Sequence, residues 1–369
     1  MRHGCLKWLA AGGCLAWALA LSMAAPVGAA PADRAAAAEA PSAGLAFAAA
    51  GEEFRFDTGM LRGTLRAGGK SLGLRPVLEG AAGTPVAGAF GLFSPYRLLT
   101  ADARFGPAAW DWASQAKRLP DGAVEVQWRP DAEHPLEITA VYRWTAPGVL
   151  DFQATVKAPR DLRKFELFLA SYFNGFPSSL VYVEESPEAG GKPGFLEARQ
   201  AAGVWQAFPR DDEAARTIAD GRWNRPPNPV DWKIMPRLAA PLALRRDAKS
   251  GLAAVLMAPA EECFAVSTPF GEEGHRSVYL SLFGRDLKAG EAASARARLV
   301  IGRLISDQQA VALYQSYVTA ADSGRAAGLP TRSASCDAGP SVASSRRGSG
   351  DPPRTISGGG VTGSRNVRR

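Results

Sequence analysis

The strongest constraint on the fold is a series of short segments in which apolar and polar side chains alternate. Residues 136–144 and 149–156 both show this period of two, and a Pro-Gly pair at 147–148 separates them. Alternation of this kind is typical of half-buried β-strands, and the turn residues between them predict a hairpin. Similar patterns predict further strands at residues 124–128, 164–172, 180–183, 252–257, 263–268, 277–283 and 294–301.

Only one helix is clearly indicated. Ser306 is followed three residues later by Gln309, which is the pattern of a capping box, and apolar residues at helical spacing continue to about residue 321. Many strands separated by turns, without amphipathic helices between them, favour an antiparallel sandwich over a parallel α/β sheet. We therefore predict an all-β fold, a large antiparallel β-sandwich over residues 51–320 with one C-terminal helix.

The first residues resemble an export signal. Arg2 and Lys7 precede an uncharged apolar stretch that ends in small residues, so we predict a signal peptide over residues 1–29 and a secreted, periplasmic or cell-envelope protein. An uncleaved membrane anchor is the alternative for this stretch. No other segment is long and apolar enough to cross a membrane, so we expect no integral membrane segment after signal cleavage.

Low-complexity sequence flanks the predicted domain on both sides. Residues 30–50 are rich in Ala, Pro, Gly and Ser and predict a flexible spacer. Residues 321–369 lack aromatic side chains and predict a disordered basic tail, with a tether for acidic polysaccharide or an anionic membrane as the alternative. The formal net charge of +7 comes from the two ends of the chain, because residues 31–319 are balanced. We therefore expect no nucleic acid partner.

Several kinds of chemistry are poorly represented in the sequence. After the predicted leader only Cys263 and Cys336 remain, so no framework of disulfides is expected. The same region has only two histidines, His134 and His275, which disfavours an ordinary zinc site. It contains no Gly-rich phosphate loop and no Gly-x-Ser-x-Gly elbow. We predict neither a cofactor nor a bound metal.

One short loop combines residues that could transfer protons. Glu272 and Glu273 precede His275, just before the strand predicted at 277–283. A carboxylate beside an imidazole raises the pKa of the imidazole and can form an acid/base pair. We name His275, Glu272 and Glu273 as catalytic candidates. The competing interpretation is an exposed acidic hairpin tip, and His134 is interpreted as a histidine in a solvated turn.

A second group of candidates combines aromatic rings with polar neighbours. Exposed Trp and Tyr rings stack on the apolar faces of sugar rings, while Asp, Asn and Arg bind the hydroxyl groups. The alternative for each Trp is an ordinary place in the core. The substrate-binding candidates from this composition are Trp110, Asp111, Trp112, Arg210 and Trp223, and Trp205 and Trp232 belong to the same aromatic set. Arg285 follows the strand predicted at 277–283 and is a further binding candidate that could face a cleft, with a structural salt bridge as the alternative.

The stretch Leu169-Ala170-Ser171-Tyr172-Phe173-Asn174-Gly175 is similar to the H-x-Y-F-N-L segment of aldose 1-epimerases, the galactose mutarotases. The resemblance implies a galactose mutarotase-like β-supersandwich with a sugar-binding cleft, and it adds Tyr172 and Asn174 to the binding candidates. Ala170 stands where that family has its general-acid His, and the family's Glu base has no counterpart. The resemblance therefore argues against ordinary mutarotation.

Taken together, these patterns predict a secreted protein that binds or acts on a mono- or oligosaccharide. Whether it is an enzyme stays open. If it is, acid/base catalysis at a sugar, as in an epimerase, an isomerase or a uronic-acid lyase, is expected. The alternative is a non-catalytic structural or scaffold protein of the cell envelope. The sequence does not predict an oligomeric state.

Overall fold

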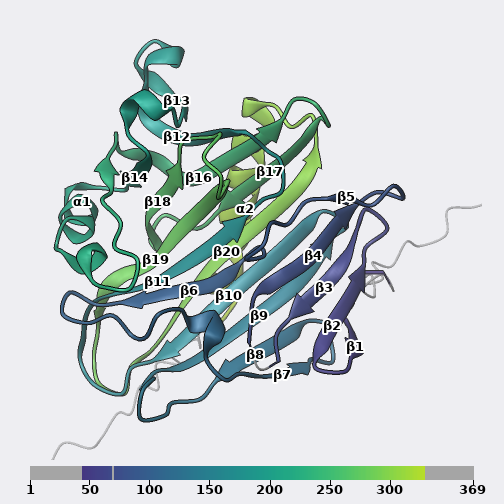
Figure 1. The fold of residues 1–369 in the computed structure, drawn as a ribbon, viewed down its shortest axis with the longest axis vertical. Helices are drawn as coiled ribbons and strands as arrows, with labels where there is room; N and C mark the ends of the chain where they lie inside the picture. Colours follow the sequence, from purple (N-terminus) through teal and green to yellow (C-terminus); the bar gives the residue numbers. More distant parts are fainter. Residues whose placement is uncertain (1–43, 69, 329–369) are drawn as a thin grey trace, which may run out of the picture. The chain divides into compact units, whose positions relative to one another are not determined.

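The computed structural model describes residues 44–68 and 70–328, which form three β-sheets and two α-helices (Figure 1). Residues up to Val318 make one compact unit, and a second unit begins at Thr319. The predicted all-β class with a C-terminal helix is confirmed. The residues that carry the leader prediction, 1–29, lie outside the described part of the chain, as do Cys336 and most of the predicted tail.

The largest sheet has nine strands, all paired antiparallel. The predicted hairpin lies in this sheet, where Ala146 is opposite Val149. In hydrogen-bonded order the strands are β13 (Lys192–Glu197), β12 (Ser178–Ser186), β16 (Leu238–Asp247), β17 (Leu252–Met257), β20 (Ala292–Arg303), β10 (Val149–Lys157), β9 (Glu137–Ala146), β8 (Val124–Trp128) and β7 (Gln115–Arg118).

The second sheet has six strands and carries the surface described in the next section. One short pairing in it is parallel, that of its first two strands, and the others are antiparallel. In hydrogen-bonded order the strands are β15 (Lys233–Ile234), β14 (Trp205–Pro209), β18 (Cys263–Pro269), β19 (Ser277–Leu287), β11 (Leu162–Tyr172) and β6 (Ser94–Leu99).

An N-terminal sheet of five antiparallel strands completes the set. It shares the main core, because Phe56 packs against Trp144 of β9 with ring centroids 4.8 Å apart. Phe47 is also buried in this core, so the folded part starts within the range predicted as a spacer. The strands are β1 (Ala48–Ala50), β2 (Glu53–Asp57), β3 (Leu61–Arg66), β4 (Gly73–Glu79) and β5 (Thr84–Pro85).

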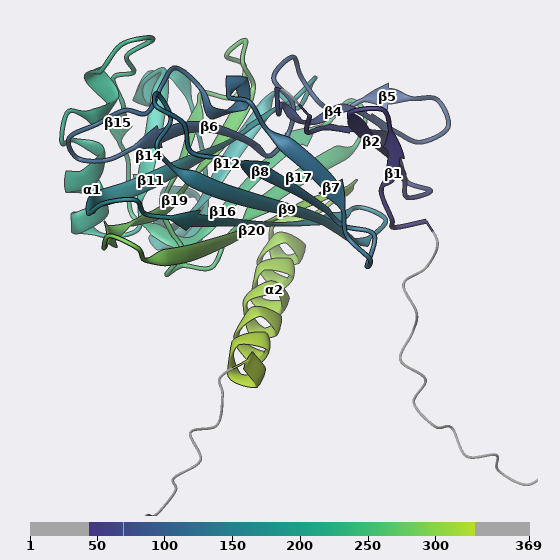
Figure 2. The same ribbon diagram turned by 90° about the horizontal axis from the view of Figure 1, so that it is seen from below.

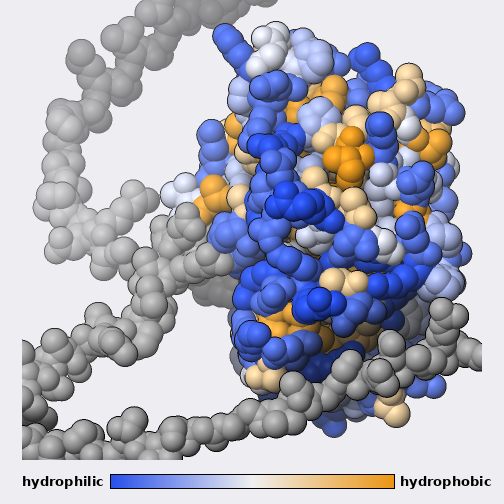
Figure 3. Space-filling model, turned by 90° about the vertical axis from the view of Figure 1, so that its left-hand side faces the viewer, coloured by the Kyte–Doolittle hydropathy of each residue, from blue (hydrophilic) through white to orange (hydrophobic). Residues whose placement is uncertain are grey.

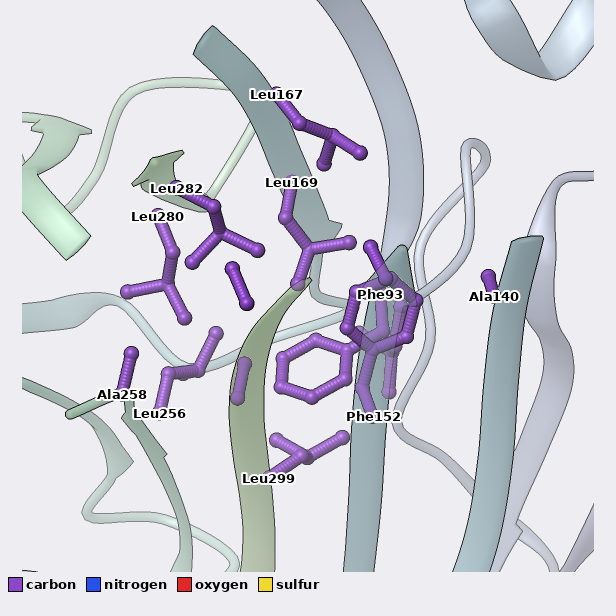
Figure 4. Close-up of a cluster of buried hydrophobic side chains, with 14 of the residues drawn as sticks. Phe93, Ala140, Phe152, Leu167, Leu169, Leu256, Ala258, Leu280, Leu282 and Leu299 are labelled. Carbon is purple, nitrogen blue, oxygen red and sulfur yellow. The ribbon is translucent and has the colours of Figure 1, made fainter. Parts of the chain in front are cut away.

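The two larger sheets enclose the main hydrophobic core. Because side chains alternate along a strand, each strand sends every second residue into this layer. Figure 4 shows leucines of β11 and β19 pointing toward apolar side chains of β10, β17 and β20. The labelled side chains that meet here include Leu167, Leu169, Leu280, Leu282, Phe152, Leu256 and Leu299.

The helix α2 (Asp307–Gly328) starts beside β20 (Figure 2). The predicted capping box is present, since the backbone N–H of Gln309 donates to Ser306 Oγ over 3.2 Å and Gln309 Oε1 accepts from the Ser306 N–H over 2.8 Å. Ala310 and Tyr317 of this helix pack against β17, whose residues Ala253, Val255 and Met257 face away from the main core. The strand β17 is therefore buried on both faces.

The remaining helical elements are short. The helix α1 starts after Asp211, whose side chain accepts a hydrogen bond from the backbone of Ala214, an ordinary N-cap. These elements are η1 (Ala109–Asp111), η2 (Pro187–Ala189), η3 (Gln200–Ala202), α1 (Asp212–Ile218) and η4 (Arg222–Asn224). Among the described residues, no helix is long and apolar enough to span a membrane.

Candidate functional site

The outer face of β11 is the base of the candidate site. Leu167 and Leu169 point into the main core, so the alternate residues Phe168, Ala170 and Tyr172 point the other way. These three belong to a second buried cluster that is rich in aromatic rings. A cleft of about 550 Å³ opens above this cluster, lined by residues of the six-stranded sheet, the segment around η1 and the segment after η4.

One wall of the cleft is a stack of three rings. Trp110 of η1 lies between Tyr96 and Phe90, with centroid distances of 4.2 and 5.7 Å and interplanar angles of 4° and 11°. Trp110 is buried, whereas Phe90 is 43% exposed and Tyr96 is half-buried. The stack therefore presents flat apolar surface to the cleft without exposing its central ring.

A second group of rings comes from three tryptophans. Trp232 is perpendicular to Trp205 and to Trp223, at centroid distances of 5.8 and 5.4 Å. Trp223 is buried, while Trp205 and Trp232 are half-buried. Such edge-to-face packing fixes each ring and leaves part of two rings accessible.

The base of the cleft carries phenol groups. Phe168 stacks on Tyr279 of β19 at 4.5 Å, and Tyr279 Oη accepts a hydrogen bond of 2.8 Å from Ser277 Oγ and lies 3.5 Å from Tyr172 Oη. Burial raises the pKa of Tyr279 to about 12 and also raises that of Tyr172. Both phenols therefore remain protonated at neutral pH and act as hydrogen-bonding groups rather than as bases.

Arg97 of β6 is the buried cation of the cleft and is 4% exposed. Its guanidinium carbon lies 4.9 Å from the Tyr96 ring centroid and 5.0 Å from that of Trp223. Its Nη2 donates to the Asn228 carbonyl over 2.8 Å and reaches Tyr96 Oη at 3.3 Å. Its buried Nε has no hydrogen-bond partner in the part of the chain that the structure describes.

Residues 225–230 cross one side of the cleft and are held by arginines. Arg104 donates to the carbonyls of Arg225, at 3.1 Å, and Pro227, and Arg225 in turn donates to the Ala101 carbonyl over 2.6 Å. Burial, together with the charge of Arg97, lowers the pKa of Arg104 to about 10. This segment of three prolines is therefore fixed by cations that bind backbone oxygens.

Trp223 is positioned by an ion pair below it. Arg222 and Glu166 are both fully buried and lie 3.0 Å apart, and Arg222 also binds Asp220 at 2.8 Å. Burial raises the pKa of Glu166, although the charge of Arg222 opposes this shift. The pair ties η4 to β11 and so holds the tryptophan wall against the sheet.

His275 lies at the rim of the cleft. Its Nδ1 is 2.8 Å from Glu273 Oε1, and its backbone N–H donates to Glu273 Oε2 over 2.8 Å. The imidazole ring is 5.5 Å from the Trp205 ring and 6.3 Å from the Tyr172 ring, and its side chain is 49% exposed. The predicted pair of an imidazole and a carboxylate is thus present beside the aromatic walls.

Residues 270–276 form the loop that carries His275, which we call the histidine loop, and Arg245 of β16 binds its backbone. Its guanidinium is fully buried and donates to the carbonyls of Phe176, Ser277 and Gly271 at 3.0, 2.9 and 2.6 Å. These carbonyls lie at the two ends of the loop and in the chain before β12. A single side chain therefore sets the path of the backbone that carries His275.

Five of the predicted site residues line the cleft. They come from elements that are distant in sequence, including η1, β11, η4 and the loop before β19. The two other tryptophans of the predicted aromatic set, Trp205 and Trp232, line it as well. The five are Trp110, Asp111, Tyr172, Trp223 and His275.

The other predicted binding residues lie elsewhere. Trp112 is buried in the main core, 4.2 Å from the His134 ring, and Asn174 Nδ2 donates to the Pro85 carbonyl over 3.3 Å. Arg210 binds Asp211 at 2.8 Å, and Arg285 binds Glu291 at 2.9 Å on the surface. These four residues have structural partners outside the cleft lining.

The two predicted carboxylates of the histidine loop differ in their surroundings. Glu272 is exposed and does not line the cleft, whereas Glu273 is half-buried and touches it only through its hydrogen bond to His275. Among the described residues that line the cleft, Asp111 alone carries a carboxylate, and it forms an ion pair with Lys70 at 3.3 Å. Over residues 44–68 and 70–328, no group of three or more His, Cys, Asp or Glu is arranged to hold a metal ion.

Several cleft residues were not among the predicted site residues, and they include Phe90, Tyr96, Arg97, Phe168 and Tyr279. Tyr279 and Phe168 could have been found from the two-residue period, since both fall on the face opposite the leucines of their strands. The direction of Arg97 could not be predicted from the two-residue period, because β6 has a bulge opposite Phe168 and Leu169 that interrupts the alternation.

The surface next to α1 is mostly hydrophilic, with small separate hydrophobic patches (Figure 3). Small scattered apolar patches are ordinary on a folded protein and do not indicate a broad docking surface. The apolar side chains that are coloured on this face therefore form separate patches rather than one broad surface.

No protein-family model matches the chain, and no curated protein matches it. Solved structures do match, at low identity. A galactose mutarotase-like protein from Lactobacillus casei has a TM-score of 0.44 and 10% identity, over 68% of this chain and 100% of that one. A putative aldose 1-epimerase from Escherichia coli K12 has a TM-score of 0.38 and 11% identity, over 70% and 99%.

An alpha-N-acetylgalactosaminidase from Bifidobacterium bifidum also matches, with a TM-score of 0.45 and 13% identity, over 72% of this chain but only 39% of that one. The structures that resemble this chain thus include those of the galactose mutarotase-like kind, as expected from residues 169–175. The likeness is distant and concerns the fold.

Proposed function

We propose that the cleft binds a carbohydrate, a mono- or oligosaccharide, outside the cytoplasm. The observation that carries this proposal is the set of partly accessible flat rings around one cavity, those of Phe90, Tyr96, Trp205 and Trp232. A sugar ring has apolar C–H faces that stack on such rings. The cleft has a volume of about 550 Å³, which suits a small ligand. The extracytoplasmic location rests on the leader-like sequence of residues 1–29.

Polar groups at the edges of the rings support the same ligand class. Arg97, Asp111, Asn228 and His275 all line the cleft, so donors and acceptors surround the aromatic surface. Hydroxyl groups at the edge of a stacked sugar would meet these side chains. An apolar body with a few placed polar groups is the usual composition of a small-molecule site.

Proton transfer on the bound sugar is the second part of the proposal. Glu273 binds Nδ1 of His275, which favours a proton on that nitrogen and leaves Nε2 to accept one. Ala170, at the position of the mutarotase general acid, lies on the cleft side of β11 and has no proton to give. We therefore favour epimerisation or elimination over ordinary mutarotation, with a non-catalytic scaffold as the alternative.

Replacement of ring surface tests the binding proposal. Trp205→Ala and Trp232→Ala should each weaken saccharide binding about tenfold or more, because each removes stacking surface from a half-buried ring. Binding would be measured by calorimetry after a glycan array has identified a ligand. Tyr182→Ala is the control, since Tyr182 packs against Phe195 away from the cleft. Unchanged affinity in both Trp variants would contradict the proposal.

The catalytic part is tested separately in the same samples. His275→Ala should abolish product formation while the affinity for the sugar changes little, and His134→Ala should keep full turnover, because His134 lies against Trp112 outside the cleft. Equal turnover in wild type and His275→Ala would remove the catalytic role. Sugar binding without any product in the wild type would support the non-catalytic alternative.

A further inference from the structure

Arg97 has unused hydrogen-bonding capacity. Among the described residues, Nη2 of its guanidinium forms hydrogen bonds, to the Asn228 carbonyl and Tyr96 Oη, and the buried Nε finds no partner there. The rings of Tyr96 and Trp223 compensate part of the lost hydration of the charge but offer no further acceptor to Nε or Nη1. A buried cation without a full set of acceptors is costly unless a ligand supplies them.

The surroundings of Arg97 add positive charge and no matching anion. Arg104 and Arg225 bind only backbone carbonyls, and within the described ranges neither of them nor Arg97 forms an ion pair. The carboxylate of Asp111, which lines the cleft, is paired with Lys70. This side of the cleft therefore has an excess of cations.

We infer that Arg97 binds a carboxylate of the ligand, so that the saccharide taken by this cleft is an acidic one containing a uronic acid. The inference rests on the proposed function and specifies its substrate class. A carboxylate supplies acceptor oxygens to the guanidinium and balances its charge in one contact.

The shape of the site favours a flat anion. The guanidinium is held between two rings at centroid distances of 4.9 and 5.0 Å, which restricts its plane. A carboxylate can accept from the N–H groups of Nη1 in that plane, since those of Nη2 are already used, and the sugar ring that bears it would lie against the neighbouring aromatic walls. Stacking and charge pairing would then act on the same sugar unit.

The test compares acidic oligosaccharides with their own neutral counterparts. Oligosaccharides of glucuronic, galacturonic and mannuronic acid, and the same compounds after reduction of the carboxyl group to an alcohol, are titrated into the full-length protein by calorimetry. At least one acid should bind roughly tenfold or more tightly than its reduced form, a factor within reach of one charge-assisted contact. This comparison uses the wild type and does not depend on the folding of any variant.

Variants assign the preference to one side chain. Arg97→Gln should remove the preference for the acid, so that the affinities for the acid and for its reduced form come within about a factor of two of each other. Arg285→Gln, which alters a surface arginine paired with Glu291, should change neither affinity. A preference that survives Arg97→Gln would overturn the assignment.

The outcomes separate the two proposals. Equal binding of acids and reduced sugars would overturn the uronic acid inference and leave the carbohydrate site intact. Tight binding of a sulfated neutral oligosaccharide, with no preference for carboxylates, would also overturn it in favour of a sulfate. If neither acidic nor neutral saccharides bind, the proposed function itself fails.

Discussion

At the scale of single residues, Arg245 has the clearest structural role. It is fully buried, and its hydrogen bonds within the described ranges go to three backbone carbonyls around the histidine loop. Burial, and then the charge of Arg276, lowers its pKa to about 9. It therefore stays charged at neutral pH, and the three carbonyls are what stabilise that charge.

Arg245→Met should lower the free energy of unfolding by roughly 2–4 kcal/mol, because three buried carbonyls lose a charged donor. Chemical denaturation would measure the change. Arg246→Met is the matched control. Arg246 is the next residue of β16, is 30% exposed, and binds Ile305 and Asp307 on the other face, so the expected loss is about 1 kcal/mol or less. Equal losses in the two variants would show that Arg245 has no special role.

Cleft residues could be predicted from the sequence where the residue type itself indicates a binding or catalytic role. His275, Trp110 and Trp223 were chosen because their residue types can transfer protons or stack on a sugar, and the structure places all three in the cleft lining. Trp112 was misplaced, since sequence proximity to Trp110 says nothing about direction in a loop. Arg97 was missed because an unpaired arginine is defined only by its neighbours in space.

At the scale of elements, β11 explains how a core strand also builds a site. Its leucines face the main core, and Phe168 and Tyr172 face the cleft, so both surfaces of the strand are buried. A strand buried on both faces has a nearly continuous apolar sequence. The site is thereby built on a rigid strand, which keeps the aromatic base in place.

The helix α2 depends on its first turn in a way that can be measured. Ser306→Ala removes the acceptor for the Gln309 N–H and should lower stability by about 0.5–2 kcal/mol. Ser316→Ala, on the exposed side of the same helix, should have little effect. Hydrogen exchange of residues 307–318 would report the local loss, and equal exchange in the two variants would contradict a role for the cap.

Elements were predictable where the period of two is regular. All nine segments predicted as strands are strands, and β8 has the bounds predicted for it. The N-terminal sheet was missed, because β1 and β5 are very short and β3 and β4 contain Gly63 and Pro76. The strand β16 was missed as well, since Pro241 and two adjacent arginines interrupt its apolar pattern.

At the scale of the whole molecule, the order of strands in the sheets could not be predicted from the local sequence pattern. The strand β20 lies between β17 and β10, which end about 35 and 135 residues before it in sequence, and β16 lies between β12 and β17. Such pairings are selected by the burial of whole faces rather than by the residues of one segment. The cleft could not be predicted for the same reason, because its walls come from segments that are brought together by the complete sheet.

Acid should destabilise the folded molecule through its surface carboxylates. A side-chain hydrogen bond from Thr100 lowers the pKa of Asp102, and one from Arg143 lowers that of Asp121. A carboxyl group with a lowered pKa adds stability above its unfolded pKa of about 4 and loses it as the pH falls further. The described carboxyl groups with a lowered pKa are Asp102, Asp121, Asp131, Asp161, Asp211, Asp247 and Glu291.

Glu166 should affect the pH dependence of stability in the opposite direction. Burial raises its pKa, so its contribution to the free energy of unfolding would be lost as the pH rises. Seven described carboxyl groups have a lowered pKa and one has a raised pKa. We therefore expect the total pH dependence of the free energy of unfolding to have the direction set by the seven. The free energy of unfolding should change little between neutral pH and about pH 5, and fall steadily below about pH 4. Denaturant titrations at a series of pH values would measure it. Asp121→Asn should flatten the fall, since it removes one titrating partner of Arg143, whereas stability that increases on acidification would show that the buried glutamate dominates.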